Sequence, residues 1–204
     1  MKKFLIVLML LLFQPVVFAA KEVKVPEEIY KWVQSTERGN YYFNYQVCGY
    51  HVKLDGTLDL NRLIVPTVCT YDDVQIKDVI QKRRWNNKST KGYNILAGRA
   101  DYLQFDLKNN TVQVTRRADI DNTFTELDSD TSGKPVKLSE FTGKEVACKF
   151  YREILIWAKQ NNDWMIRRSR GKLSAKDSKL KPEDFPIYKI PLPGEDETDG
   201  EDND

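Results

Sequence analysis

The stretch YLQFDLKNNTVQV, Tyr102 to Val114, decides the fold class of this chain. Apolar and polar residues alternate on both sides of an Asn109-Asn110 pair, and a period of two is typical of a strand with one buried face. Asparagine readily adopts the backbone conformations of a tight turn. The stretch therefore predicts an antiparallel hairpin that is half-buried. Its core-facing residues are Leu103, Phe105, Leu107, Val112 and Val114.

A second hairpin is predicted upstream of this one. Aromatic and polar residues alternate from Tyr41 to Cys48, and Asp55-Gly56 is a strong hairpin turn signal between two strand-like runs. If these two residues form the turn, the numbers of opposed residues sum to 111, so that Cys48 faces Leu63 and Cys69 faces Tyr42. At about 3.4 Å per residue, the sulfurs of Cys48 and Cys69 then lie roughly 20 Å apart, too far for a disulfide.

The remaining cysteine is Cys148, and an odd count leaves at least one thiol without a partner in the chain. The sequence leaves open whether Cys148 forms a bridge or all three cysteines stay unpaired as small apolar residues.

Helical patterns flank the predicted strands. Residues 26–36 begin with a proline and two glutamates and place Ile29, Trp32 and Val33 on one face, which predicts a short helix. Residues 142–160 begin with a Thr-x-x-Glu capping box and carry the strongest helical periodicity in the chain. Residues 73–85 fit either pattern, and their β-branched residues favour a strand.

Together these patterns predict an α+β fold in a single domain. We expect an antiparallel sheet of about four to six strands, from about Tyr41 to Thr125, with the helices at 26–36 and 142–160 packed on one face. The domain should span residues 21–165. Residues 166–193 read as a basic and proline-containing extension that adds no core, and residues 194–204 as an acidic disordered tail.

The first twenty residues predict export. MKKFLIVLMLLLFQPVVFAA has two lysines, an apolar run and a small-residue end, the layout of a secretory signal peptide cut after Ala19 or Ala20. The apolar run is shorter than the roughly 20 residues that a membrane-spanning helix needs. We therefore expect a mature chain without an integral membrane span, in the periplasm or outside the cell.

The charge of the mature chain is unevenly distributed. Loss of Lys2 and Lys3 from the 32 basic residues leaves 30, against 30 acidic ones. The end GEDETDGEDND holds seven acids and no base, so the rest of the mature chain has 23 acids against 30 bases, a net charge of +7. A basic body and an acidic end predict contact with charged partners, but they indicate no particular reaction.

Signatures of common enzymes are missing from the sequence. There is one histidine, His51, and no HExxH, GxSxG or GxxxxGK[ST] motif. The histidine and the cysteines lack the paired spacings of a zinc site. A hydrolase that uses paired carboxylates stays open, because such acids meet only in the folded chain.

One acidic stretch resembles half of a calcium loop. Counted from Asp128, positions 1, 3, 5 and 6 are Asp128, Asp130, Ser132 and Gly133, as in an EF-hand. Position 12, however, is Ser139, and the acid Glu140 comes one residue late. The candidate calcium ligands are Asp121, Asp128, Asp130 and Ser132. The alternative, which the composition favours, is a polar turn between the sheet and the helix at 142–160.

A basic stretch is the second candidate site. Arg83, Arg84, Trp85 and Lys88 combine cations with an aromatic ring, as anion-binding surfaces do. For an exported chain an envelope protein or an anionic glycan is the expected partner, and nucleic acid is not. The alternative is a charged sheet edge that resists aggregation.

These observations predict an exported, non-catalytic module of the cell envelope or exterior that acts by binding a partner. The alternatives are a secreted hydrolase with paired carboxylates and a calcium-stabilised binding module.

Overall fold

The centre of the fold is a pair of long strands whose alternating apolar residues face one side. The computed structural model describes residues 23–131 and 133–194, and in it Leu63, Val65, Leu103 and Phe105 are buried side by side on neighbouring strands. The predicted hairpin from Tyr102 to Val114 is confirmed, with Phe105 opposite Val112.

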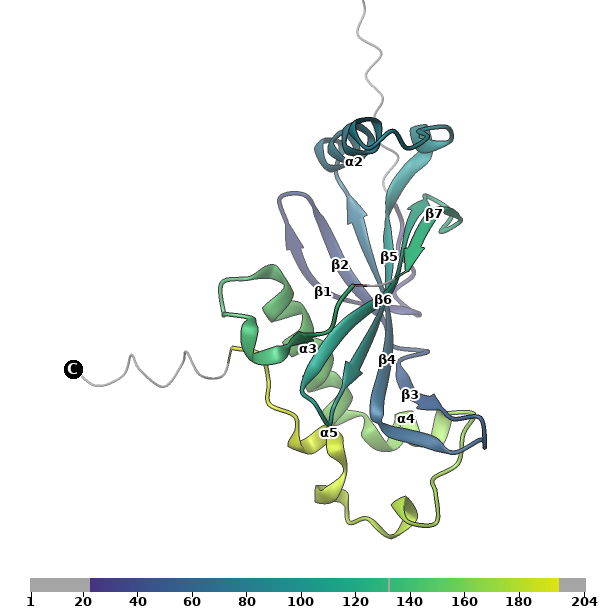
Figure 1. Ribbon diagram of the computed structural model, residues 1–204, viewed down its shortest axis with the longest axis vertical. Coiled ribbons are helices and arrows are strands. Elements are labelled where there is room, and N and C mark those ends of the chain that lie inside the picture. The colour runs from purple at the N-terminus through teal and green to yellow at the C-terminus, as the bar shows by residue number, and fades with distance from the viewer. Residues whose placement is uncertain (1–22, 132, 195–204) are drawn as a thin grey trace, which may run out of the picture.

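Within the described residues the chain forms one antiparallel sheet of eight strands in the order β1-β2-β4-β5-β6-β7, with β3 beside β4 and β8 beside β6 (Figure 1). The strands are β1 Tyr30–Thr36, β2 Gly39–Asn44, β3 Gly49–Val52, β4 Leu58–Tyr71, β5 Leu96–Asp106, β6 Thr111–Asp121, β7 Glu126–Thr131 and β8 Val136–Lys137. β4 has 14 residues, so one half pairs with β2 and the other with β3. The fold is α+β, but the predicted sheet of four to six strands is too small.

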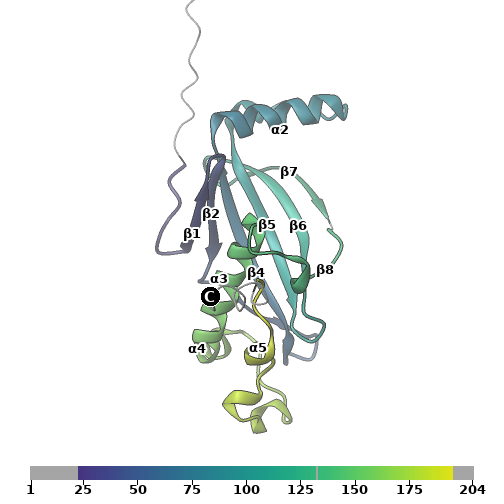
Figure 2. The same ribbon diagram turned by 90° about the vertical axis from the view of Figure 1, so that its left-hand side faces the viewer.

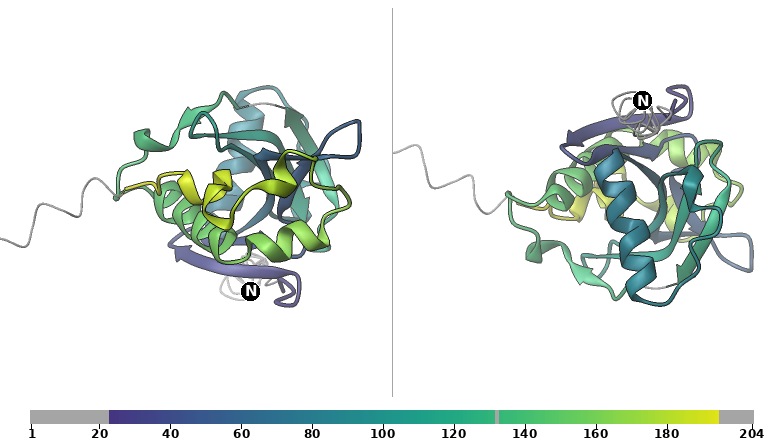
Figure 3. Two further views of the ribbon diagram at one scale, coloured as in Figure 1. Left: turned by 90° about the horizontal axis from the view of Figure 1, so that it is seen from below. Right: turned by 90° about the horizontal axis from the view of Figure 1, so that it is seen from above.

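The helices of the described part are α2 Asp73–Trp85, α3 Val146–Gln160, α4 Asn162–Arg168 and α5 Pro186–Lys189, with short 3-10 turns at Tyr93–Ile95, Leu138–Glu140, Asp177–Lys179 and Pro182–Asp184. α3, α4 and α5 lie on one face of the sheet, called here the helix-covered face (Figure 2). α2 lies across the ends of the strands, as the view from above shows (Figure 3, right). No helix among the described residues is long and apolar enough to cross a membrane.

The predicted helix at 26–36 is wrong, because residues 30–36 form the edge strand β1. β1 pairs with β2 from Tyr30 opposite Asn44 to Thr36 opposite Gly39. Trp32, which the helical pattern placed in the core, is 55% exposed. A short isolated helix is marginal in water, whereas the edge of β2 supplies backbone partners along the whole segment. Pairing with the sheet therefore overrides the local pattern.

The preference for a strand at 73–85 is also wrong. The side chain of Asp72 accepts a hydrogen bond from the Gln75 backbone N–H at 2.6 Å and caps α2. Asp73 lies in the first turn, and basic residues fill the last turn, as the helix dipole favours. None of the helix's residues is buried, so capping and charge, which the apolar pattern did not reflect, determine this helix.

The helix predicted at 142–160 begins at Val146, four residues later than expected. Glu145 is its N-cap and makes no side-chain capping bond, so the Thr142 capping box does not form. The apolar face is as predicted, with Phe150, Ile154, Leu155 and Ala158 buried. Gly56, at φ 78°, forms the predicted turn after β3.

The register upstream of that turn differs from the prediction. Residues 45–47 form a turn that splits the expected long strand into β2 and β3. Because of this turn and a bulge after Tyr50, Leu63 lies opposite Tyr50 and Cys69 opposite Tyr41. All three cysteines are buried, and none of them is in a disulfide.

The segment after Met165 belongs to the core, contrary to expectation. Phe185, Ile187 and Ile190 are buried in the same cluster as Leu155 and Ala158. Seen from below, this segment and α3 lie together against the sheet (Figure 3, left). Prolines limit the conformations of the unfolded segment, so a few apolar residues suffice to hold it on the helices.

The packing of α5 gives a first prediction. Ile187→Ala should lower the free energy of unfolding by about 2–5 kcal/mol, because Ile187 is fully buried and truncation leaves a cavity. Chemical denaturation of the chain from Lys21 onward measures this. Leu54→Ala, at a fully exposed leucine, is the control and should change stability by less than about 0.5 kcal/mol. Equal midpoints for the two variants would show that α5 is not part of the cooperative core.

Candidate functional site

Polar residues replace apolar ones at the α2 end of the helix-covered face. Strand pairing joins Tyr41, Cys69, Arg99, Asp119 and Asp128 into one row across β2, β4, β5, β6 and β7. The next row on this face consists of Thr67, Asp101, Arg117 and Asp130. Residues paired in an antiparallel ladder present neighbouring side chains on the same face. The sheet therefore collects these side chains from distant parts of the sequence.

Asp101 is the centre of this cluster and is held by two arginines. Arg117 donates to both of its carboxylate oxygens, from Nε at 2.8 Å and from NH2 at 3.0 Å. The side chain of Asp101 is only 9% exposed, and the Nε of Arg99 lies 3.3 Å from its second oxygen. Arg117 is thus committed to Asp101 by a bidentate ion pair, the strongest common geometry for these groups.

Arg99 is incompletely satisfied. Its Nε is buried and is not aligned to donate a hydrogen bond. Its two terminal nitrogens make no hydrogen bond or ion pair with any described residue. The side chain is 30% exposed, so solvent or a ligand can reach it. Burial alone would lower the pKa of Arg99, but the Asp101 carboxylate outweighs it and the pKa is raised. Arg99 therefore remains a cation with unused donors.

A cavity of about 170 Å³ opens over Arg99. Its polar side includes Arg99, Asp101 and Arg117, and its apolar side is formed by Leu103 and by the first two turns of α3. The lining residues from α3 are Val146, Ala147, Phe150 and Tyr151. Burial raises the pKa of the Cys69 thiol, which also lines the cavity. The cavity thus combines a neutral apolar wall with one available cation.

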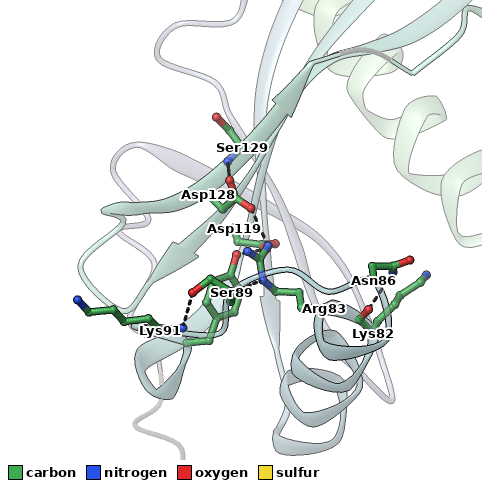
Figure 4. A network of polar contacts seen from close by, with 9 residues as sticks. Lys82, Arg83, Asn86, Ser89, Lys91, Asp119, Asp128 and Ser129 are labelled. Atoms are coloured by element: carbon green, nitrogen blue, oxygen red, sulfur yellow. Dashed lines mark hydrogen bonds and ion pairs between the residues drawn. The ribbon is translucent and has the colours of Figure 1, made fainter.

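A second cavity, of about 300 Å³, lies between α2 and the β6 and β7 strands. Figure 4 shows the network beside it, in which Arg83 is the central residue. NH1 of Arg83 donates to Asp128 Oδ2 at 2.7 Å and lies 3.6 Å from Asp119 Oδ2, and Nε donates to the Ser89 carbonyl at 2.9 Å. The guanidinium lies 4.1 Å from the centre of the Tyr93 ring. This arginine fastens α2 to the sheet and has few donors left for a ligand.

The predicted basic and acidic sites therefore meet each other at Arg83 and Asp128. Arg84 and Trp85 are exposed, and Lys88 lines the second cavity. Arg83 is 12% exposed at its side chain, so the basic stretch is divided between one structural arginine and exposed neighbours. The alternative of a charged sheet edge is wrong, because the stretch is the end of α2.

The candidate calcium ligands are arranged differently from a loop. Residues 126–131 form β7, so the predicted polar turn is also wrong here, and Asp128 and Asp130 point to one face of a strand. A hydrogen bond from Arg83 lowers the pKa of Asp128. Asp121 accepts from the Thr123 and Thr125 backbone N–H groups and from the Thr123 hydroxyl, which lowers its pKa. Ser132 lies outside the described residues. In the parts of the chain that are described, no group of three or more His, Cys, Asp or Glu side chains could hold a metal ion.

Sequence reasoning missed Arg99, Asp101 and Arg117. A usable signal was present, because Arg99 and Asp101 continue the period-two pattern of Leu103 and Phe105 on β5. Charged residues in phase with a core face require partners there. The sequence does not indicate which strand provides them.

The arrangement offers little for proton transfer. Hydrogen bonds lower the pKa of the carboxyl groups of Asp55, Asp121 and Asp128, whereas a general acid needs a raised one. Asp101 has its oxygens occupied by arginine. His51 is exposed on β3, where it lines two other cavities of about 500 Å³ each, and it does not line the cavities at Arg99 and Arg83.

The contacts of Arg83 predict that its substitution will loosen α2 locally. Arg83→Gln should raise the amide hydrogen exchange of α2 at least about tenfold, because the contacts to Asp128, Ser89 and Tyr93 are removed together. Arg84→Gln is the matched control, since the neighbouring side chain is exposed. Equal exchange in the two variants would refute a fastening role for Arg83.

The same network should depend on pH. The pKa of Asp128 is lower in the folded chain than in the unfolded one, so its contribution is complete above the ordinary value of about 4 and is lost as pH falls through the folded value. The guanidinium N–H resonances of Arg83, which donates to Asp128, should therefore change below about pH 4, while those of the exposed Arg84 stay constant. Asp128→Asn should abolish this change, and a variant that still shows it would assign the titration to another group.

Comparisons of the chain with models of protein families, with curated proteins and with solved structures gave no match.

Proposed function

We propose that the protein is an exported, non-catalytic binding module of the cell envelope or exterior, and that it holds its partner by an anionic group at Arg99. The observation that carries this proposal is the unused donor capacity of Arg99 beside a cavity. The proposal of export is based on the N-terminal pattern, which lies outside the described residues.

The electrostatics around Arg99 support an anion as the ligand. A cation taken partly out of water is costly unless it is paired. Asp101 shares its charge between Arg99 and Arg117, and its best hydrogen bonds go to Arg117. An anion at the terminal nitrogens of Arg99 would complete its pairing and would form charge-assisted bonds.

Binding without turnover is supported by the state of the nearby acids. The carboxylates of this face accept hydrogen bonds from Arg83, Arg117 and Tyr93, at Asp128, Asp101 and Asp119 respectively. Among them, the hydrogen bond from Arg83 lowers the pKa of Asp128, which makes this carboxyl group a poor proton donor. The carboxylates of this face therefore hold Arg99 and α2 in position.

Titration with acetate tests the proposal. Acetate is the simplest carboxylate and should bind weakly, because a charge-assisted contact of about 1.5–3 kcal/mol corresponds to affinities no tighter than millimolar. In NMR spectra of the chain from Lys21 onward, the amides of Arg99, Ala147 and Tyr151 should shift on addition of acetate up to about 100 mM at constant ionic strength.

Arg99→Gln should abolish these shifts. Arg116→Gln is the control, because Arg116 lies on the other face of the sheet, where it contacts Glu126 and Tyr102. Chloride at the same concentration is the control for ionic strength. If acetate shifts no amide near Arg99, or shifts the same amides in Arg99→Gln, the proposed function is wrong.

A further inference from the structure

We propose that the ligand of the Arg99 cavity is a small monocarboxylate with an apolar body about the size of a benzene ring or of a chain of five or six carbons. This inference rests on the proposed function and specifies the ligand class of the same site. It is carried by the free donors of Arg99, the charges beside it, and the volume and lining of the cavity.

The available donors fit a carboxylate. Arg99 is the lining cation with both terminal nitrogens free of partners among the described residues, whereas Arg117 uses Nε and NH2 on Asp101 and keeps only NH1. The planar guanidinium fork matches two carboxylate oxygens. An ammonium ligand is excluded, because its positive charge would lie in contact with the positive charge of the Arg99 guanidinium.

The neighbouring charges favour one negative charge over two. Asp101 lines the cavity, and Asp119 lies opposite Arg99 in the register of β5 and β6, outside the cavity lining. A dianion such as a phosphate monoester would bring its second charge close to Asp101, and Arg117, the other cation that lines the cavity, is already paired with that aspartate. Like charges at such distances repel more strongly in a partly buried site than in water.

The wall of the cavity opposite Arg99 is apolar, and it fits the apolar body of the proposed ligand. Val146, Ala147, Phe150 and Tyr151 come from α3 and Leu103 from β5. Phe150 is buried, and the Tyr151 ring is fixed edge-on by Phe105 and Phe141. These contacts hold the two aromatic rings of the wall in place, whereas Val146 is 43% exposed. The volume of the cavity between the rings and Arg99 therefore limits the size of the ligand.

The volume sets that limit. About 170 Å³ is close to the size of an engineered apolar cavity of about 150 Å³ that holds benzene in another protein. The carboxylate would lie at Arg99, whose partial exposure connects the cavity with solvent. The ligand is therefore of the size of benzoate or hexanoate, and longer chains must leave carbons outside.

A series of straight-chain carboxylates tests this inference. Affinities of acetate, butyrate, hexanoate, octanoate and decanoate are measured by NMR titration or calorimetry with the chain from Lys21 onward. Each buried methylene contributes about 0.8 kcal/mol, or roughly fourfold in affinity. Affinity should rise by this factor to about hexanoate and then level off or fall. Benzoate should bind at least tenfold more tightly than benzyl alcohol and than phenyl phosphate.

Two variants of α3 separate the cavity from general hydrophobic contact. Ala147→Leu fills the cavity. It should lower the affinity for hexanoate at least tenfold and change the affinity for acetate by no more than about twofold. Lys149→Leu introduces the same side chain at an exposed position of the helix and should leave the rise from acetate to hexanoate unchanged. Thermal melts of both variants confirm that they are folded.

The outcomes distinguish this inference from the proposed function. If acetate binds at Arg99 but hexanoate and benzoate bind no more tightly, the ligand class is wrong and the anion site stands. A continued rise through decanoate, or tighter binding of phenyl phosphate than of benzoate, also overturns the ligand class. If acetate itself does not bind, the proposed function fails together with this inference.

Discussion

The bidentate pair between Asp101 and Arg117 is the constraint on which the rest of the helix-covered face depends. At this point the apolar face of β5 becomes charged, and a carboxylate that is 9% exposed has to be paired there. Breaking a buried pair by removal of one partner is costly, because the other charge is left in a poor solvent. Because Arg117 uses its Nε and NH2 on Asp101, Arg99 keeps donors that no described residue fills. Arg99 is thus available as a cation because Asp101 makes its hydrogen bonds with Arg117.

The same logic separates Arg83 from Arg99. Both arginines have aspartates near them, but Arg83 has two acids, a carbonyl and an aromatic ring around one guanidinium. Its donors are largely used within the protein, so its role is to hold α2, a helix with no buried residue. Arg99 has one shared acid and a cavity. Sequence alone ranked these residues the other way, because Arg83 lies in a conspicuous basic run and Arg99 does not.

What the sequence predicted correctly depends on local periodicity. The hairpin around Asn109-Asn110 and the apolar face of α3 were predictable because each repeats its own pattern over several turns or residue pairs. The strand β1 and the helix α2 were mispredicted because β1 depends on the edge of β2, and α2 on the Asp72 cap and its terminal charges. The charged rows could be predicted only in part. Alternation places Arg99 and Asp101 on the core face, but the pairing with Arg117 depends on the β5–β6 register, including the bulge between Tyr102 and Leu103.

That bulge explains why the polar and apolar parts of the face coexist. It separates the register of Asp101 and Arg117 from that of Leu103 and Val114, and bulges commonly re-aim side chains beside functional sites. If stability were the only demand on this face, an apolar residue in place of the buried Asp101 would extend the core toward α2, since replacing buried ionic groups by apolar side chains is often neutral or stabilising. The two arginines that pair with it are 30% and 43% exposed and would not then be needed. The charged rows are therefore not required by the core, and a cavity-facing cation is the feature that an all-apolar face would lack.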